Sequence, residues 1–254
     1  MAEKFELRTR HQFAGLIERR DRWILTRDQP EPRARFEQLT DLEWARQNYS
    51  LESRAEAVLR KKVSPDDSLL DSQFRCHLAA VQTLLRFAGE KEFLSGSDLL
   101  ELHRVLTSGV HPRAGEFRQQ EATPLAPGHE PTDPDLVPPV VDNALGWFQS
   151  ESFAEMHEVE KSALMLIKLM DVQPFDEANG RTLRLFSNFF LLKAGYPPAI
   201  VPASQADQYA LAIQRSLGFD TQPIVDLIAE ATARSLRWCL GEPPAPPKLK
   251  VLPD

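Results

Sequence analysis

The chain has 254 residues, of which 42% are hydrophobic and 26% are charged, and its net charge is −7. This length and composition indicate one globular domain with additions, and the negative charge argues against a nucleic-acid partner held by bulk electrostatics. The two cysteines, Cys76 and Cys239, form neither a metal-binding pattern nor a disulfide framework. Because no signal core and no membrane-spanning apolar run is present, we expect a cytoplasmic protein with no membrane partner.

Helical periodicity of apolar residues dominates the chain. It predicts a short first helix around Phe13 and, after Pro30 and Pro32, a helical stripe from Phe36 toward Ser50. Further helices are expected at 68–88, after a start signal at Ser95 and Asp98, and at 140–149, 155–171, 181–194, 204–217 and 222–240.

Residues 111–140 break this pattern because they are rich in proline. A long structured loop or a short hairpin is expected there, and loops of this length in compact domains are usually functional. The tail after residue 240 is again proline-rich. The fold class is therefore predicted to be all-α with one small β-hairpin.

The segment from Gln173 to Arg184 carries the chemistry. Pro174 ends an apolar helix, and a second, buried helix begins after Gly180, whose missing side chain lets a ligand approach the backbone. The free N–H groups of that helix start attract anions. Arg181 and Arg184 lie three residues apart on its first turn, which makes a site suited to polyphosphate.

Two carboxylates beside this site would repel phosphate unless a divalent cation bridges them. Asp176 or Glu177 is thus a candidate Mg²⁺ ligand. The plainer alternative is that the two arginines only form salt bridges with nearby acidic residues.

The same segment resembles the Fic (Fic/Doc) motif, HPFx(D/E)(A/G)NGRxxR, at every specified position but the first. The resemblance extends to residues 114–118, which resemble the start of the family's flap hairpin, to 191–198, and to Gln208-Tyr209. It implies the Fic fold, a helical bundle around a central motif helix with a small β-hairpin flap. The resemblance covers roughly residues 35–235, and the expected domain organisation is an N-terminal helical extension at 1–34, a Fic domain at 35–240 and a proline-rich tail at 241–254.

Members of this family typically transfer AMP from ATP, with Mg²⁺, to a hydroxyl group of a target protein. The resemblance assigns Glu177 to the metal, Phe175 to anchoring the loop, and Phe117 and Arg118 to the flap that docks the target. It assigns nucleotide binding to Asn179, Gly180, Arg181, Arg184 and Tyr209.

An upstream element within residues 44–54 resembles the family's inhibitory helix motif, (S/T)xxxE(G/N). There a glutamate pairs with the second arginine and displaces the γ-phosphate, so Glu52 and Arg184 would be that pair. The match is degenerate, since Asn48 and Ser53 replace the consensus residues. The alternative is that Glu52 is an ordinary solvated glutamate.

Gln173 stands where the family has the histidine that takes the proton from the attacking hydroxyl. A glutamine amide cannot accept that proton usefully, and losing such a base typically costs ~10²–10⁴-fold in rate. Three explanations stay open: a deliberate inactivating substitution, natural decay to a pseudoenzyme, or another base such as Asp171 or Asp176. His157 is the histidine nearest in sequence, and we expect it at the surface.

The sequence therefore predicts one of two functions. The first is an autoinhibited protein adenylyltransferase, impaired at Gln173, that acts on an unknown protein hydroxyl. The alternative is a non-catalytic module that binds nucleotide or protein. The sequence leaves open whether the chain is an enzyme and whether its exposed apolar helix faces form a homodimer.

Overall fold

The computed structural model describes residues 2–60 and 71–244. The first half of the chain contains α1 (Ala2–Thr26), α2 (Pro30–Gln38), the π-helical turn η1 (Leu39–Glu43), α3 (Trp44–Arg60), α4 (Asp71–Glu90) and α5 (Gly96–Thr107). The second half contains η2 (Pro134–Leu136), α6 (Val137–Trp147), α7 (Glu151–Ala154), α8 (Glu158–Val172), α9 (Asn179–Ser187), α10 (Phe189–Lys193), η3 (Ala203–Gln205), α11 (Ala206–Leu217) and α12 (Gln222–Leu240). The all-α prediction is confirmed.

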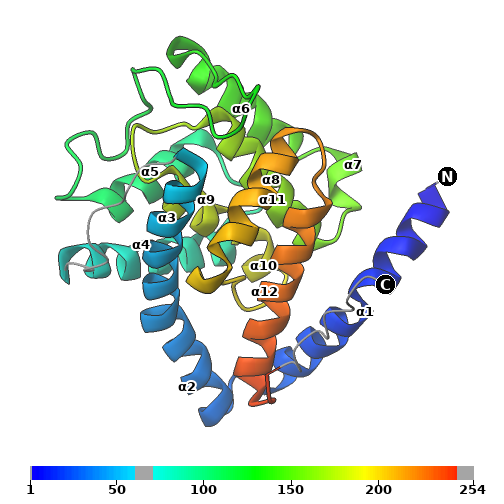
Figure 1. Ribbon diagram of the computed structural model, residues 1–254. Coiled ribbons are helices and arrows are strands. Elements are labelled where there is room, and N and C mark those ends of the chain that lie inside the picture. Colours follow the sequence, from blue (N-terminus) through cyan, green and yellow to red (C-terminus); the bar gives the residue numbers. More distant parts are fainter. Residues whose placement is uncertain (1, 61–70, 245–254) are drawn as a thin grey trace, which may run out of the picture.

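Helix α9 lies at the centre of the bundle (Figure 1). It packs against α3, α4, α5 and α8, and eight of its residues are buried. This arrangement confirms the expectation that the motif helix lies at the centre, although its buried residues include the polar Asn179, Thr182 and Arg184. The one residue of α9 that is not buried, Arg181, lies in its first turn.

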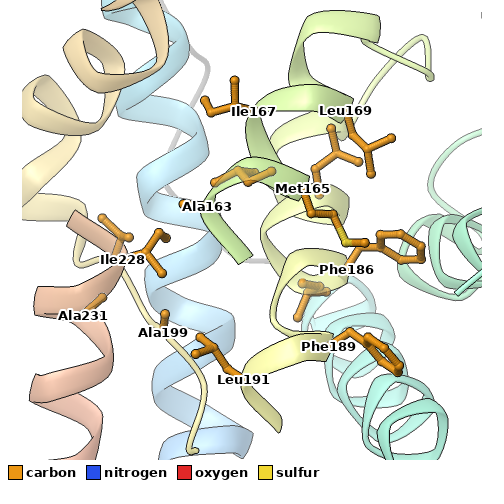
Figure 2. Close-up of a cluster of buried hydrophobic side chains, with 14 of the residues drawn as sticks. Ala163, Met165, Ile167, Leu169, Phe186, Phe189, Leu191, Ala199, Ile228 and Ala231 are labelled. Carbon is orange, nitrogen blue, oxygen red and sulfur yellow. The ribbon is translucent and has the colours of Figure 1, made fainter. Parts of the chain in front are cut away.

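The core beneath α9 is built from residues of four helices. Figure 2 shows Met165 and Leu169 of α8 beside Phe186 of α9, with α10 and α12 contributing Phe189 and Ile228. These aliphatic and aromatic side chains are almost completely buried. Their burial fixes the position of the loop between α8 and α9.

The helix expected at 181–194 is interrupted at Asn188, where α9 ends and α10 begins. The Asn188 side chain donates to the Arg184 carbonyl at 2.7 Å and accepts the Ala199 N–H at 2.7 Å. An asparagine that bonds to backbone groups in this way competes with regular helix pairing. The predicted single helix was therefore wrong at this position.

Two further expectations need correction. The first helix is not short, because α1 runs for 25 residues. His157 is not at the surface: it caps α8 through the Val159 N–H, stacks on Phe13 at 4.3 Å and lies 3.2 Å from the Tyr196 hydroxyl. It joins α1 to the body of the protein.

Residues 111–133 form turns and irregular loop, and no strand occurs within the described residues. The β-hairpin expected there is not seen. Pro124, Pro127 and Pro131 lack the N–H that strand pairing requires. The other expected helices are present, although residues 68–70 and the tail beyond 244 lie outside the described residues.

Helix α1 packs on α12 (Figure 1). Its Phe13, Leu16 and Trp23 belong to the same core cluster as the α8–α12 residues. Among the helices described, none is long and apolar enough to cross a membrane.

Candidate functional site

The loop between α8 and α9 is a tight turn that bonds to itself. Gln173 ends α8 in the left-handed conformation with φ of 47°, and Ala178 has φ of 59°. Between them the Asn179 side chain accepts the Phe175 N–H at 2.9 Å and donates to the Phe175 carbonyl at 2.6 Å. Asn179 thus holds the loop closed and sets where α9 begins.

The start of α9 has no side-chain cap. Its first regular bond runs from the Thr182 N–H to the Ala178 carbonyl, so the preceding amides can face a ligand. A Cβ on Gly180 would overlap the Glu52 carboxylate. The negative group that this helix start attracts is therefore, in this structure, the side chain of Glu52.

Glu52 lies on α3 between the two arginines of α9. Its Oε2 is 2.9 Å from a terminal nitrogen of Arg184, and its Oε1 is 3.9 Å from Nε of Arg181. The carboxylate is only 13% exposed. The expected pair of Glu52 and Arg184 is thus formed, and the alternative of a solvated glutamate is wrong.

Arg184 is 7% exposed and uses every guanidinium nitrogen. Besides Glu52 it donates to the Asn48 side-chain oxygen at 2.6 Å, to the Asn48 carbonyl at 2.9 Å and to the Tyr209 hydroxyl at 3.3 Å. Burial alone would lower the arginine pKa, but Tyr209 and Glu52 outweigh it and the pKa lies above its ordinary value. Arg184 is a fixed positive charge held beside the helix start.

Tyr209 of α11 contacts Arg184 through its hydroxyl and is 1% exposed. The guanidinium carbon of Arg184 is 5.4 Å from the centre of its ring. Burial raises the pKa of its hydroxyl, and Arg184 partly opposes that. In this structure Tyr209 supports an arginine and has no open ring face.

Arg181 has unused hydrogen-bonding capacity. Its guanidinium lies 4.6 Å above the ring of Tyr49, and its Nε is buried without a hydrogen-bond partner in the described part of the chain. A buried donor left unpaired costs about 1–3 kcal/mol. A phosphate oxygen is the kind of acceptor that would satisfy it.

Glu177 is exposed at the mouth of the loop, whereas Asp176 pairs with Arg113 at 3.3 Å. Within residues 2–60 and 71–244 no group of three or more metal-binding side chains is present. Mg²⁺ is usually held by one or two carboxylates together with water and substrate phosphates. The single exposed carboxylate of Glu177, next to the start of α9, is compatible with that mode of binding.

Arg118 is placed differently from the expectation of a target-facing flap residue. It is 2% exposed, and its guanidinium donates to the carbonyls of Gln173 (2.7 Å), Gln120 (2.7 Å), Thr132 and Val172 (3.3 Å). Burial lowers the pKa of Arg118, and the acidic residues Glu121, Asp176 and Asp133 oppose this effect. Arg118 therefore connects the loop at 111–133, through Gln120 and Thr132, to the end of α8.

The other flap residue, Phe117, is half-buried, with its ring centre 6.1 Å from that of Phe175. Phe175 itself is 1% exposed and stacks on His103 with the ring centres 3.7 Å apart. The expected anchoring role of Phe175 agrees with this packing.

Gln173 is completely buried. Its side-chain amide donates to the Thr123 carbonyl at 2.9 Å, and its own carbonyl accepts from Arg118. The residue thus links the motif loop to the flap. Of the two candidate replacement bases, Asp176 is paired with Arg113, and a carboxylate oxygen of Asp171 lies 3.3 Å from His129.

Sequence reasoning missed three histidines around the site, because none belongs to the motif. His77 lies 3.2 Å from the Asn48 amide, and its pKa is lowered to about 3 by burial and by Arg184 and Arg181. His103 accepts the Gly115 N–H at 3.0 Å. Burial, with smaller effects from His111 and Arg181, lowers its pKa to about 4 against the opposing Glu177 backbone. His129 accepts the Leu125 N–H at 3.0 Å and lies 3.1 Å from the Asp171 carbonyl.

Comparison with known proteins finds relatives of part of this chain. The Fic/DOC family model matches residues 93–191. The protein adenylyltransferase Fic of Drosophila mojavensis is 36% identical over 148 residues, which are 58% of this chain and 29% of that protein. That of Culex quinquefasciatus is 29% identical over 199 residues, 75% of this chain and 39% of that protein. The chain therefore spans less than two fifths of these relatives.

Solved structures share the fold. A Fic-1 structure from C. elegans has a TM-score of 0.71 at 24% identity and covers 91% of this chain and 71% of its own. A Fic-domain signaling protein from Bacteroides thetaiotaomicron has a TM-score of 0.70 at 20% identity and covers 89% of this chain and 98% of its own. The match to the Fic/DOC family model at residues 93–191 and the shared fold show which family this part of the chain is similar to.

Proposed function

We propose that this chain binds Mg²⁺ and ATP at the N-terminus of α9 and is built for transfer of AMP to a protein hydroxyl. The observation that carries the proposal is the anion site at Gly180, flanked by Arg181 and Arg184 and filled by a carboxylate of the chain itself. A site that accepts one anion at a helix start with two guanidinium groups suits another, the polyphosphate.

In this function Arg184 and Arg181 hold the β- and γ-phosphates, and Gly180 allows the phosphates to approach the backbone. Glu177 supplies the protein ligand to Mg²⁺, which neutralises charge on the phosphates. The hydroxyl oxygen of the target forms a bond to the α-phosphorus, the bond to pyrophosphate breaks, and the hydroxyl proton leaves to a base. Gln173 cannot be that base, so the chemical step is slow.

Glu52 competes with the nucleotide under this proposal. Its carboxylate and a γ-phosphate would need the same terminal nitrogen of Arg184. Two anions cannot share that position without strong repulsion. Two residues would therefore limit the activity: Glu52 would weaken nucleotide binding, and Gln173 would slow the transfer step.

Labelling with ATP that carries a radioactive α-phosphate tests the proposal. We expect no labelled protein with the unsubstituted chain. With Glu52→Ala combined with Gln173→His, we expect label on the variant itself or on lysate proteins. The matched control adds Arg184→Ala to that pair and should abolish the label. Absence of label in the Glu52→Ala, Gln173→His protein would contradict transfer activity.

The second candidate is a non-catalytic nucleotide-binding module. The buried hydrogen bond of Gln173 to Thr123 favours it, because it gives the glutamine a structural role. Under this candidate, Glu52→Ala binds Mg²⁺ and ATP in calorimetry, yet restoring His at position 173 adds no labelling. Label in the double variant would exclude it.

A further inference from the structure

His103 lies outside the motif segments at 48–53 and 173–184. It projects from α5, is 1% exposed, and lies between the flap and the motif loop. Its ring stacks on Phe175 at an interplanar angle of 7°. Its Nδ1 accepts the Gly115 N–H at the start of the flap.

The bond from Gly115 settles which ring nitrogen carries the proton. Because Nδ1 is an acceptor, the neutral ring has its proton on Nε2. That Nε2 is buried and makes no hydrogen bond among the described residues. The ring stacks on Phe175 of the motif loop, and the nearby Glu177 backbone acts to raise its pKa, as a carbonyl facing an imidazole does. A buried N–H donor therefore faces the loop segment that carries the proposed metal ligand.

We propose that His103 is a positioning residue, whose Nε2–H holds the backbone carbonyl of Glu177 and so orients the Glu177 carboxylate toward Mg²⁺ bound with ATP. The idea rests on the proposed function of the α9 site. The same ring fixes Gly115, so loop and flap are set by one side chain. The driving force is the unpaired buried donor, which gains an acceptor when the loop settles around the metal.

Gly115 makes this link specific. It has φ of +83°, and a Cβ there would overlap the Arg104 side chain. The backbone must therefore come close to α5, which brings its N–H within reach of His103. A side chain at 103 with a ring but no nitrogen would keep the packing, lose the bond from the Gly115 N–H and lack the Nε2–H donor.

The test compares His103→Phe, His103→Asn and the control His157→Phe, all in the Glu52→Ala protein. Phe keeps the stacking on Phe175 but has neither the acceptor for the Gly115 N–H nor the Nε2–H donor. Asn can still accept the Gly115 N–H but has no group at the place of Nε2. His157 is a buried, stacked histidine of α8 whose contacts lie outside the loop and flap.

Calorimetric affinity for ATP is measured with Mg²⁺ and with EDTA. We expect the ratio of the two affinities to fall about tenfold in both His103 variants, equivalent to one hydrogen bond, and to stay at the parent value in His157→Phe. An unchanged ratio in the His103 variants would overturn the proposal.

Nuclear magnetic resonance of the nucleotide-free Glu52→Ala protein tests His103 independently of binding. We expect the Nε2–H tautomer, and at least about tenfold faster exchange of the Gly115 amide in His103→Phe but not in His103→Asn. Equal exchange in His103→Phe and the parent would overturn the link to the flap. If Glu52→Ala binds no ATP in either condition, the proposed function fails while the tautomer and Gly115 exchange still decide whether His103 joins loop and flap.

Discussion

At the scale of single residues, the site is defined by the position beside Arg184 and Gly180, which the Glu52 carboxylate occupies and a phosphate would also need. Gly180, Glu52 and Arg184 meet so closely that neither a Cβ nor a second anion fits between them. Asn48 adds two further bonds to Arg184, so the guanidinium stays in place when the carboxylate leaves. The degenerate match at Asn48 does not predict this role, because the contact between Asn48 and Arg184 joins residues 136 positions apart.

Gly180→Ala tests that close approach. Alanine is the better helix former by about 1 kcal/mol, yet we expect the variant to unfold with about 1–3 kcal/mol less free energy, because its Cβ displaces the Glu52 carboxylate. In the Glu52→Ala protein the penalty should shrink by at least half. Urea unfolding of the four proteins measures this coupling, and equal effects of Gly180→Ala in both backgrounds would contradict it.

Arg118→Lys tests the tie between flap and loop. Lysine has three donors at one point and cannot reach the four carbonyls that Arg118 contacts. We expect a loss of about 2–3 kcal/mol in unfolding free energy, because buried carbonyls lose their partners. The control Arg46→Lys alters a side chain that is 73% exposed and should change stability by less than about 0.5 kcal/mol. Similar effects of the two substitutions would refute the tie.

At the scale of elements, the sequence predicted most helices because their apolar periodicity is local. The start signal at Ser95 and Asp98 is confirmed as a capping box of α5. Helix α6 begins at Val137 instead of 140, because proline is tolerated in a first helical turn. The break at Asn188 and the length of α1 depend on contacts with distant segments, and periodicity does not contain them.

The candidate site was likewise predictable where a sequence motif covers it and not where packing between helices decides a residue's role. The motif located the loop, both arginines and Gly180, and the upstream match located Glu52. The burial of Arg118 and Tyr209 and the roles of His77 and His103 follow from packing between α3, α4, α5 and α9. Residue type alone does not reveal whether such a side chain faces a ligand or a neighbouring helix.

Trp23→Ala tests whether α1 is part of the folded core. Trp23 is 4% exposed and lies 5.6 Å from the ring of Phe36 on α2. We expect a loss of about 3–5 kcal/mol in unfolding free energy, within one cooperative transition. Leu25→Ala, at a side chain of the same helix that is 81% exposed, should cost less than about 0.5 kcal/mol. A loss below about 1 kcal/mol for Trp23→Ala would show that α1 is only loosely attached.

At the scale of the whole molecule, buried neutral histidines make stability depend on pH. The pKa values of His77, His103 and His157 are lowered from 6.5 to about 3, 4 and 4, chiefly by burial. Well above pH 6.5 all three are neutral in both the folded and the unfolded chain. As pH falls from 6.5 toward 4, the unfolded chain binds protons that the folded protein does not, so stability is lost on acidification.

His157→Asn isolates one of these contributions. Asparagine can still cap α8 but does not titrate, so the decline in unfolding free energy below pH 6.5 should become shallower by up to about 1.4 kcal/mol per pH unit. Urea unfolding of both proteins at several pH values between about 7 and 5 measures the two slopes. Identical slopes would contradict the neutral burial of His157.

Calorimetric titration of Mg²⁺ and ATP into the parent chain, Glu52→Ala, and Glu52→Ala with Arg184→Ala tests the central claim most directly. The account predicts weak binding by the parent, at least about tenfold tighter binding by Glu52→Ala, equivalent to about 1.4 kcal/mol, and loss of binding in the double variant. Equal affinity of all three proteins, or no binding by Glu52→Ala, would contradict a triphosphate site at the start of α9.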